Sequence, residues 1–265
     1  MYKILKNAIP KDLMVNCQNY VVEQSKKLKI EEHKDEHGTY HIKRIYNDDL
    51  LRSEEVKKLI FYEPFLKRLK NEIGEFSIIN YFSCMVNSFG TAVHRDGQSF
   101  GYNLDSKKKS KKIFKIMFYL DTTKDKNINS LDVNFFDFEW PNFLINSRIF
   151  MKLNFFYEFY FRKRIMKSLN LNIGDIVIMD SNTWHSGSFV KERSNLMDTN
   201  FKCLKTLLSF EVVTDKNFAK DYASHVKETY TKSYKNNSYV SINPNLIEDK
   251  YNQVLTRNNI NTINL

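Results

Sequence analysis

The sequence predicts an α+β chain in which helices come first and an antiparallel β-sandwich or jelly roll follows. Two observations lead to this fold class. Helical apolar spacing occupies 10–29 and about 49–73, and from residue 76 onward the chain has several short strand candidates joined by loops. Because no helices alternate with these strands, antiparallel pairing is favoured over a parallel βαβ arrangement. We expect the N-terminal helices to buttress one sheet.

The helices are predicted from the spacing of their apolar residues. In 10–29, Leu13 and Cys17 begin an apolar series at helical spacing. The stretch 49–73 has the same character, but Pro64 lies inside it, where the missing N–H and the ring disturb a helix. We therefore expect a kink there, or a split into two helices.

The strands are predicted from runs of β-branched and aromatic residues. The candidates are 76–86, 113–120, 130–137, 175–180, 183–188 and 203–213. The aromatic and basic stretch 141–169 interrupts the series, either as a lid or substrate-binding wall or as helices packed on the jelly roll. Its mixture of aromatic and basic side chains also suits peripheral contact with a membrane surface.

Two polar regions lie outside this core. The first holds His33, His37 and His41, interleaved with acidic residues, and is expected to be a solvated segment rather than a second metal site. The second follows Val213, is rich in Asn, and is expected to be a covering segment or partly disordered.

Composition limits the class of protein. Hydrophobic residues make up 42% and charged residues 27%, and no long apolar run suggests a membrane span. Three widely spaced cysteines and a start without a secretory pattern predict a cytoplasmic protein. The net charge of +10 accompanies a general richness in Lys, Asn and Ile, and no nucleic-acid-binding motif occurs, so a nucleic-acid partner is not expected.

A candidate metal site combines two separated motifs. His94 and Asp96 lie two positions apart, so in an extended segment both side chains point to the same face. His185 follows the apolar strand 175–180 and a short turn. Two histidines and one carboxylate are the facial triad of non-haem iron(II) oxygenases, although this ligand set does not exclude zinc. Taken alone, His94 and Asp96 could equally form a surface ion pair.

In the order of these motifs the chain resembles the phytanoyl-CoA dioxygenase family of iron(II)- and 2-oxoglutarate-dependent oxygenases. The matching pieces are 94–96, the strand 114–121, 174–177, and the His-Ser-Gly of 185–187. The resemblance implies a double-stranded β-helix (jelly-roll, cupin-like) core, with Fe(II) as cofactor and 2-oxoglutarate as cosubstrate. The implied reaction is the hydroxylation of an unactivated C–H bond.

The resemblance also implies one oxygenase domain over 1–265. Within it we expect helical N-terminal support in 1–75, the jelly-roll core in 76–213 with the insertion or lid at 141–169, and a C-terminal extension in 214–265.

The chain departs from the family at two places. Where many relatives have Gly-Ser-His after the third strand, residues 136–140 read Phe-Asp-Phe-Glu-Trp, so the identity of the substrate cannot be transferred. The basic residue that pairs with the far carboxylate of 2-oxoglutarate is also displaced. Lys205 has the better strand position, Arg193 the better bidentate chemistry, and Lys115 is a third candidate. We favour Lys205.

Rival functions remain open at this stage. One is a non-catalytic jelly-roll protein that binds a sugar or another small ligand, and the other is a cupin-like metalloenzyme that does not use 2-oxoglutarate. The substrate is expected to be a small molecule, a lipid or a glycan. The sequence does not indicate an oligomeric state.

Overall fold

The computed structural model describes residues 2–28, 31–35, 38–86, 96, 113–120, 130–134, 166–181, 183, 185–187, 206–233 and 243–264. Its helices are α1 (Lys11–Lys26), α2 (Asn47–Leu51), α3 (Glu54–Ile60), α4 (Glu63–Ile73), α8 (Lys216–Ser233) and α9 (Asp249–Arg257), with a 3-10 turn at Pro244–Leu246. Its strands are β1 (Tyr2–Leu5), β2 (Glu31–Asp35), β3 (Gly38–Tyr46), β4 (Ser77–Val86), β5 (Ile113–Tyr119), β6 (Ser130–Asn134), β7 (Met166–Asn170), β8 (Ile176–Asp180), β9 (His185–Gly187), β10 (Thr206–Val213) and β11 (Asn261–Ile263).

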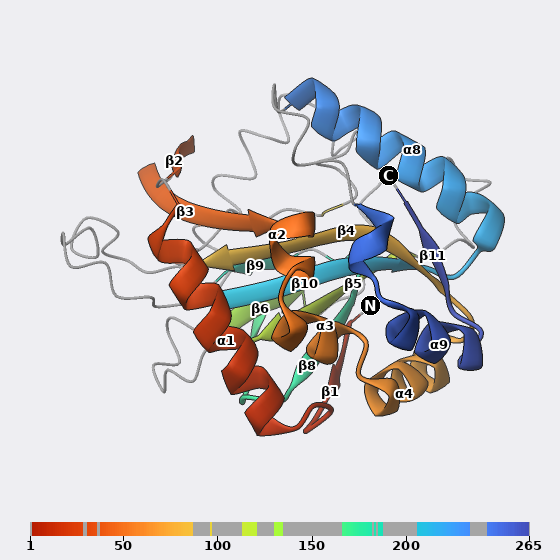
Figure 1. Cartoon of the computed structure of the whole chain (residues 1–265). Helices are drawn as coiled ribbons and strands as arrows, with labels where there is room; N and C mark the ends of the chain where they lie inside the picture. Colours follow the sequence, from red (N-terminus) through yellow and green to blue (C-terminus); the bar gives the residue numbers. More distant parts are fainter. Residues whose placement is uncertain are drawn as a thin grey trace.

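In the described part of the chain these strands form two sheets (Figure 1). The main sheet has the order β1-β8-β5-β10-β4-β3-β2, and β11 pairs in parallel with β4. The other pairings in the main sheet are antiparallel, as are those of the smaller sheet, which has the order β7-β6-β9. The prediction of an antiparallel sheet accompanied by helices is confirmed.

The two faces of the main sheet pack against different layers. Along β5, Phe114, Ile116 and Phe118 join a large cluster formed with the helices. Met117 and Tyr119 alternate with them and face the other way, where they pack with Leu169 of β7. The main sheet therefore has an outer face covered by helices and an interior face covered by the smaller sheet.

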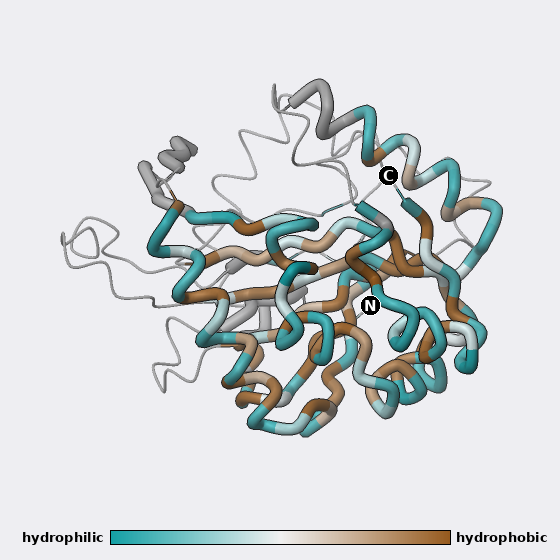
Figure 2. Tube along the Cα trace, viewed as in Figure 1, coloured by the Kyte–Doolittle hydropathy of each residue, from teal (hydrophilic) through white to brown (hydrophobic). Residues whose placement is uncertain are grey.

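The helical layer consists of α1 to α4 and α9, which lie in front of the sheet in Figure 1. Figure 2 shows the hydrophobic residues concentrated along the strands that these helices cover. The stretch 49–73 forms three helices rather than one kinked helix or two. The first break separates α2 from α3. Ser53 caps the N-terminus of α3, because its side chain accepts a hydrogen bond from the Val56 N–H at 3.3 Å. Pro64 stands in the first turn of α4, where no N–H is needed.

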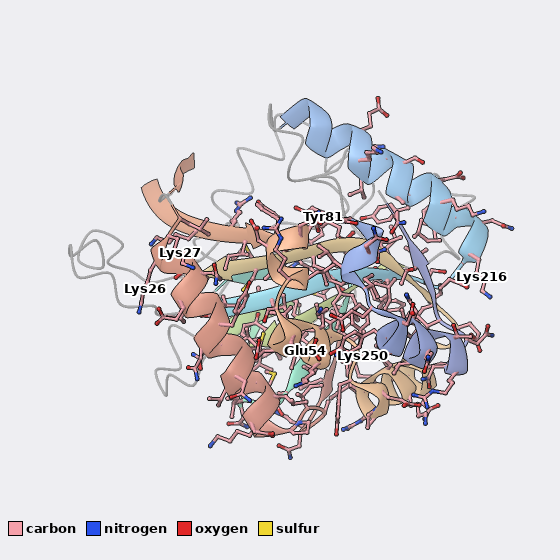
Figure 3. All side chains as sticks on the ribbon, viewed as in Figure 1. Lys26, Lys27, Glu54, Tyr81, Lys216 and Lys250 are labelled. Atoms are coloured by element: carbon pink, nitrogen blue, oxygen red, sulfur yellow. The ribbon has the colours of Figure 1, made fainter. Side chains whose placement is uncertain are left out.

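The C-terminal segment 243–264 adds a helix to the helical layer and a strand to the main sheet. Tyr251 and Leu255 of α9 are buried in the outer cluster, and β11 extends the main sheet beside β4. Charged pairs join the segment to α3: Lys57 binds Glu248 at 2.5 Å. Figure 3 shows Glu54 and Lys250 side by side at the same junction, where their charged atoms are 2.5 Å apart. This part of the tail is the expected covering segment.

Several strands were not predicted. Strands β2 and β3, which hold His33 and His41, pair with each other, and β1 forms an edge of the main sheet, so 1–75 is not helical support alone. The end of the predicted insertion 141–169 forms β7, which belongs to the smaller sheet, while 141–165 lie outside the described residues. No helix in the described ranges is long and apolar enough to cross a membrane.

The Gly-Asp pair before β8 anchors the N-terminal segment. Asp175, 1% exposed, accepts hydrogen bonds from the Lys6 ammonium at 2.6 Å and from the Asn7 N–H at 3.1 Å. Gly174 has φ +90°, and a Cβ placed on it would lie 2.8 Å from the Ile9 carbonyl oxygen. Part of the motif 174–177 therefore has a structural role, because it holds β1 against β8.

We predict that Gly174→Ala destabilises the fold by about 2 kcal/mol or more, because it combines an unfavourable positive φ with a backbone clash. Gly74→Ala is the matched control, since Gly74 has φ +82° but a Cβ added there would meet no atom within 4 Å. Urea denaturation of both variants measures the two effects. Equal losses would show that the approach of Ile9 to Gly174 contributes nothing.

Candidate active site

Two of the three predicted metal ligands lie together in the interior. Asp96 Oδ2 is 3.7 Å from His185 Nε2, and the residues are 7% and 4% exposed. Metal–ligand distances to nitrogen and oxygen are about 2.0–2.2 Å, so both donor atoms can reach one ion placed between them. His94 lies outside the described residues, and its role as the third ligand stays a prediction.

The orientation of His185 suits this role. The residue opens β9, at the edge of the smaller sheet, and is paired in register with Val133 of β6. Its Nδ1 is 3.0 Å from the Thr183 carbonyl oxygen. A carbonyl can only accept, so the hydrogen bond requires a proton on Nδ1. In the neutral ring, which is the form that binds a metal, the lone pair is then on Nε2, the atom that faces Asp96. A hydrogen bond from the other ring nitrogen is the arrangement that orients metal-binding histidines.

Among the described residues, Lys115 is the basic residue next to this pair. Its Nζ lies 3.2 Å from Asp96 Oδ1, and the two side chains are 19% and 9% exposed. Lys115 is on β5 and alternates with the outer-face residues Phe114 and Ile116, so it projects from the interior face. Of the three candidates for binding the far carboxylate of 2-oxoglutarate, the structure describes Lys115; Lys205 and Arg193 lie outside the described residues.

A second buried carboxylate stands beside Lys115 and was not predicted. Glu211 is 6% exposed, lies opposite Lys115 in the β10–β5 register, and accepts a hydrogen bond from the Tyr222 hydroxyl at 2.8 Å. Burial, followed by the charge of Asp96, raises the pKa of Glu211 to about 7, and the Lys115 charge and the Tyr222 bond oppose that rise. The available signal was a lone carboxylate within the apolar strand 206–213.

Helix α8 supplies the wall at this end of the interior. Phe218 and Tyr222 pack with Ile113 and Val213, at the ends of β5 and β10. The polarity of the interior face therefore changes along these strands. α8 covers one end, the charged residues come next, and the face becomes apolar at Met117, beyond Lys115.

Solved structures give the fold a wider context. The non-haem alpha-ketoglutarate-dependent epimerase SnoN from nogalamycin biosynthesis matches with a TM-score of 0.55 at 11% identity, covering 81% of this chain and 78% of that one. AviO1 from Streptomyces viridochromogenes Tue57 matches with a TM-score of 0.53 at 11% identity, covering 81% of this chain and 90% of that one. This chain shares their fold.

The comparisons of sequence add no family. No protein-family model matches the chain, and no curated protein matches it in sequence. Membership of the phytanoyl-CoA dioxygenase family in particular therefore stays a prediction.

The raised pKa of Glu211 predicts a pH-dependent stability. Because the pKa rises from 4.5 to about 7 on folding, the folded state binds this proton more tightly than the unfolded state. The contribution of this proton to the free energy of unfolding is fully present below pH 4.5 and is lost as the pH rises through about 7. We expect the metal-free protein to lose stability over this window relative to Glu211→Gln. Urea denaturation of both proteins in a chelator at several pH values tests this; parallel stability curves would contradict it.

Proposed function

We propose that the chain is an Fe(II)- and 2-oxoglutarate-dependent oxygenase that hydroxylates a C–H bond. The observation that carries this proposal is the approach of the Asp96 carboxylate to the His185 imidazole, 3.7 Å apart, in the buried interior between two antiparallel sheets. The pair comes from segments far apart in sequence. The fold shared with an alpha-ketoglutarate-dependent enzyme supports the same interpretation.

In this proposal the two sheets are the walls of a double-stranded β-helix, and 1–265 form one oxygenase domain. His94, Asp96 and His185 hold Fe(II), which, with 2-oxoglutarate and dioxygen, supplies the oxidising power for hydroxylation. The protein contributes position and shielding. Thr183 fixes the His185 ring through the 3.0 Å hydrogen bond, and burial of Asp96 excludes water from the carboxylate.

Lys205 is our proposal for the residue that binds the far carboxylate of 2-oxoglutarate. The described strand β10 places Leu207 on the interior face, where it packs with Met117, and Ser209 shares that face by alternation. Lys205 comes two positions before Leu207, so in this proposal the same alternation directs its side chain to the interior face. Arg193 is the alternative outside the strand, whereas Lys115 faces the buried carboxylates of Asp96 and Glu211, which compete with 2-oxoglutarate for its charge.

Substrate and surroundings are proposed at a coarser level. A small-molecule, lipid or glycan substrate fits an interior that becomes apolar beyond Lys115, near Met117 and Tyr119. The aromatic and basic stretch 141–169 is the proposed lid, with peripheral membrane contact as a further role, and a cytoplasmic location is expected. No role for nucleic acid is proposed.

The metal centre can be tested by spectroscopy. Anaerobic addition of Fe(II) and then 2-oxoglutarate to the purified protein is expected to produce the weak visible charge-transfer band of the chelated cosubstrate. His185→Ala and Asp96→Ala should lose the band because each removes a ligand. His225→Ala, on α8, is the matched control and should retain it. Iron binding without the band would favour a metalloenzyme that does not use 2-oxoglutarate, and the absence of iron binding would favour a non-catalytic ligand-binding protein.

The residue that binds the cosubstrate can be tested by substitution. Lys205→Met should weaken 2-oxoglutarate binding about tenfold or more, because a charge-assisted bond to the carboxylate is lost, on the order of 1.5–3 kcal/mol. Lys216→Met, an exposed lysine at the start of α8, is the control. Titration of the charge-transfer band gives both dissociation constants. An unchanged constant for Lys205→Met, together with a weakened one for Arg193→Met, would transfer the role to Arg193.

A further inference from the structure

Lys115 lies beside two buried carboxylates on the interior face of the main sheet. Its ammonium is 3.2 Å from Asp96 Oδ1, and Glu211 stands directly opposite on the neighbouring strand β10. Directly opposed residues on one face of an antiparallel pair have Cβ atoms about 4.5–5.5 Å apart, within reach of a lysine side chain. A change of side-chain rotamer can therefore move the ammonium from one carboxylate to the other.

The ion pair with Asp96 and a metal on Asp96 compete with each other. A divalent ion between Asp96 and His185 puts two positive charges close to the Lys115 ammonium, and repulsion is strong where burial keeps water away. The same ion neutralises the Asp96 carboxylate, which removes what attracts Lys115. Metal binding therefore favours a different partner for this lysine.

Among the described residues, Glu211 is a partner within reach. Its carboxylate is buried, and the Tyr222 hydroxyl of α8 fixes one of its oxygens by a 2.8 Å hydrogen bond. A carboxylate in such surroundings gains from a cation brought closer, because burial has removed most of its hydration. Tyr222 belongs to the apolar cluster beneath α8, so this bond ties the position of the Glu211 carboxylate to the packing of that helix.

We propose that Lys115 is a positioning residue that pairs with Asp96 in the metal-free protein and moves to Glu211 when a divalent metal binds. The inference rests on the proposed metal site. Before metal binding, Lys115 holds Asp96 in place and separates the charges of Asp96 and Glu211. After metal binding, Glu211 keeps Lys115 away from the metal.

A double-mutant cycle on metal affinity tests the exchange. The proteins are the wild type, Lys115→Met, Glu211→Gln and the double variant, and the probe is Mn(II), whose free concentration is read by electron paramagnetic resonance. At pH 8 Glu211 is mostly ionised, because its pKa is about 7. Lys115→Met should bind Mn(II) about tenfold more tightly, because a competing cation is gone. Glu211→Gln should bind it about tenfold more weakly in the wild-type background and less than threefold more weakly beside Lys115→Met.

Thermal melts give a second readout that a merely structural lysine would not produce. Lys115→Met should melt several degrees below the wild type in chelator, and saturating Mn(II) should close most of that gap. For Glu211→Gln the pattern should be reversed: its melting temperature should fall further below that of the wild type in Mn(II) than in chelator. A Lys115→Met protein that fails to fold with and without Mn(II) would overturn the exchange, because the lysine would then be needed in both states.

The outcomes separate this inference from the proposed function. If the wild type does not bind Mn(II), the metal site is wrong and the exchange is wrong with it. If the wild type binds Mn(II) but Glu211→Gln weakens binding by the same factor in both backgrounds, the metal site stands and the exchange is overturned. An unchanged affinity in Lys115→Met would overturn it in the same way.

Discussion

The alternation of side chains along β5 and β10 is the constraint on which the rest of the structure depends. Successive residues of a strand face opposite sides, so one run of residues must satisfy two different environments. Phe114, Ile116 and Phe118 meet the helices, while Lys115 between them carries its charge into the interior. A slip of one residue in the register would exchange the two sets, placing the ammonium among aromatic rings and the rings beside the carboxylates.

The interior concentrates charge that would be unfavourable in isolation. Asp96, Lys115 and Glu211 are largely removed from water, and each is stabilised by a neighbour from a different segment of the chain. Removing one member leaves the others without compensation, which is more costly than replacing the whole set by apolar residues. Such an arrangement is an inefficient way to stabilise a fold, and its position beside His185 indicates a functional role instead.

Much of the fold could be predicted because the central strands are plain in the sequence: 76–86 is rich in β-branched and aromatic residues, and 175–180 is rich in β-branched ones. The β2–β3 hairpin could not, since residues such as Glu31 and Glu32 have low strand propensity and the pairing is set by the adjoining strand β4. The pairing of Asp96 with His185 followed from motif order. The roles of Lys115 and Glu211 did not, because only the cross-strand register brings together residues 96 positions apart.

The place of β10 in the main sheet has a consequence for how the protein is made. β10 lies between β4 and β5, yet residues 206–213 are synthesised after both of them. While the chain is still on the ribosome, β4 and β5 therefore present unpaired edges to the surroundings, and such edges favour association with other chains. The main sheet is completed only when its central strand has emerged, so the charged interior is assembled after β4 and β5 have both been made.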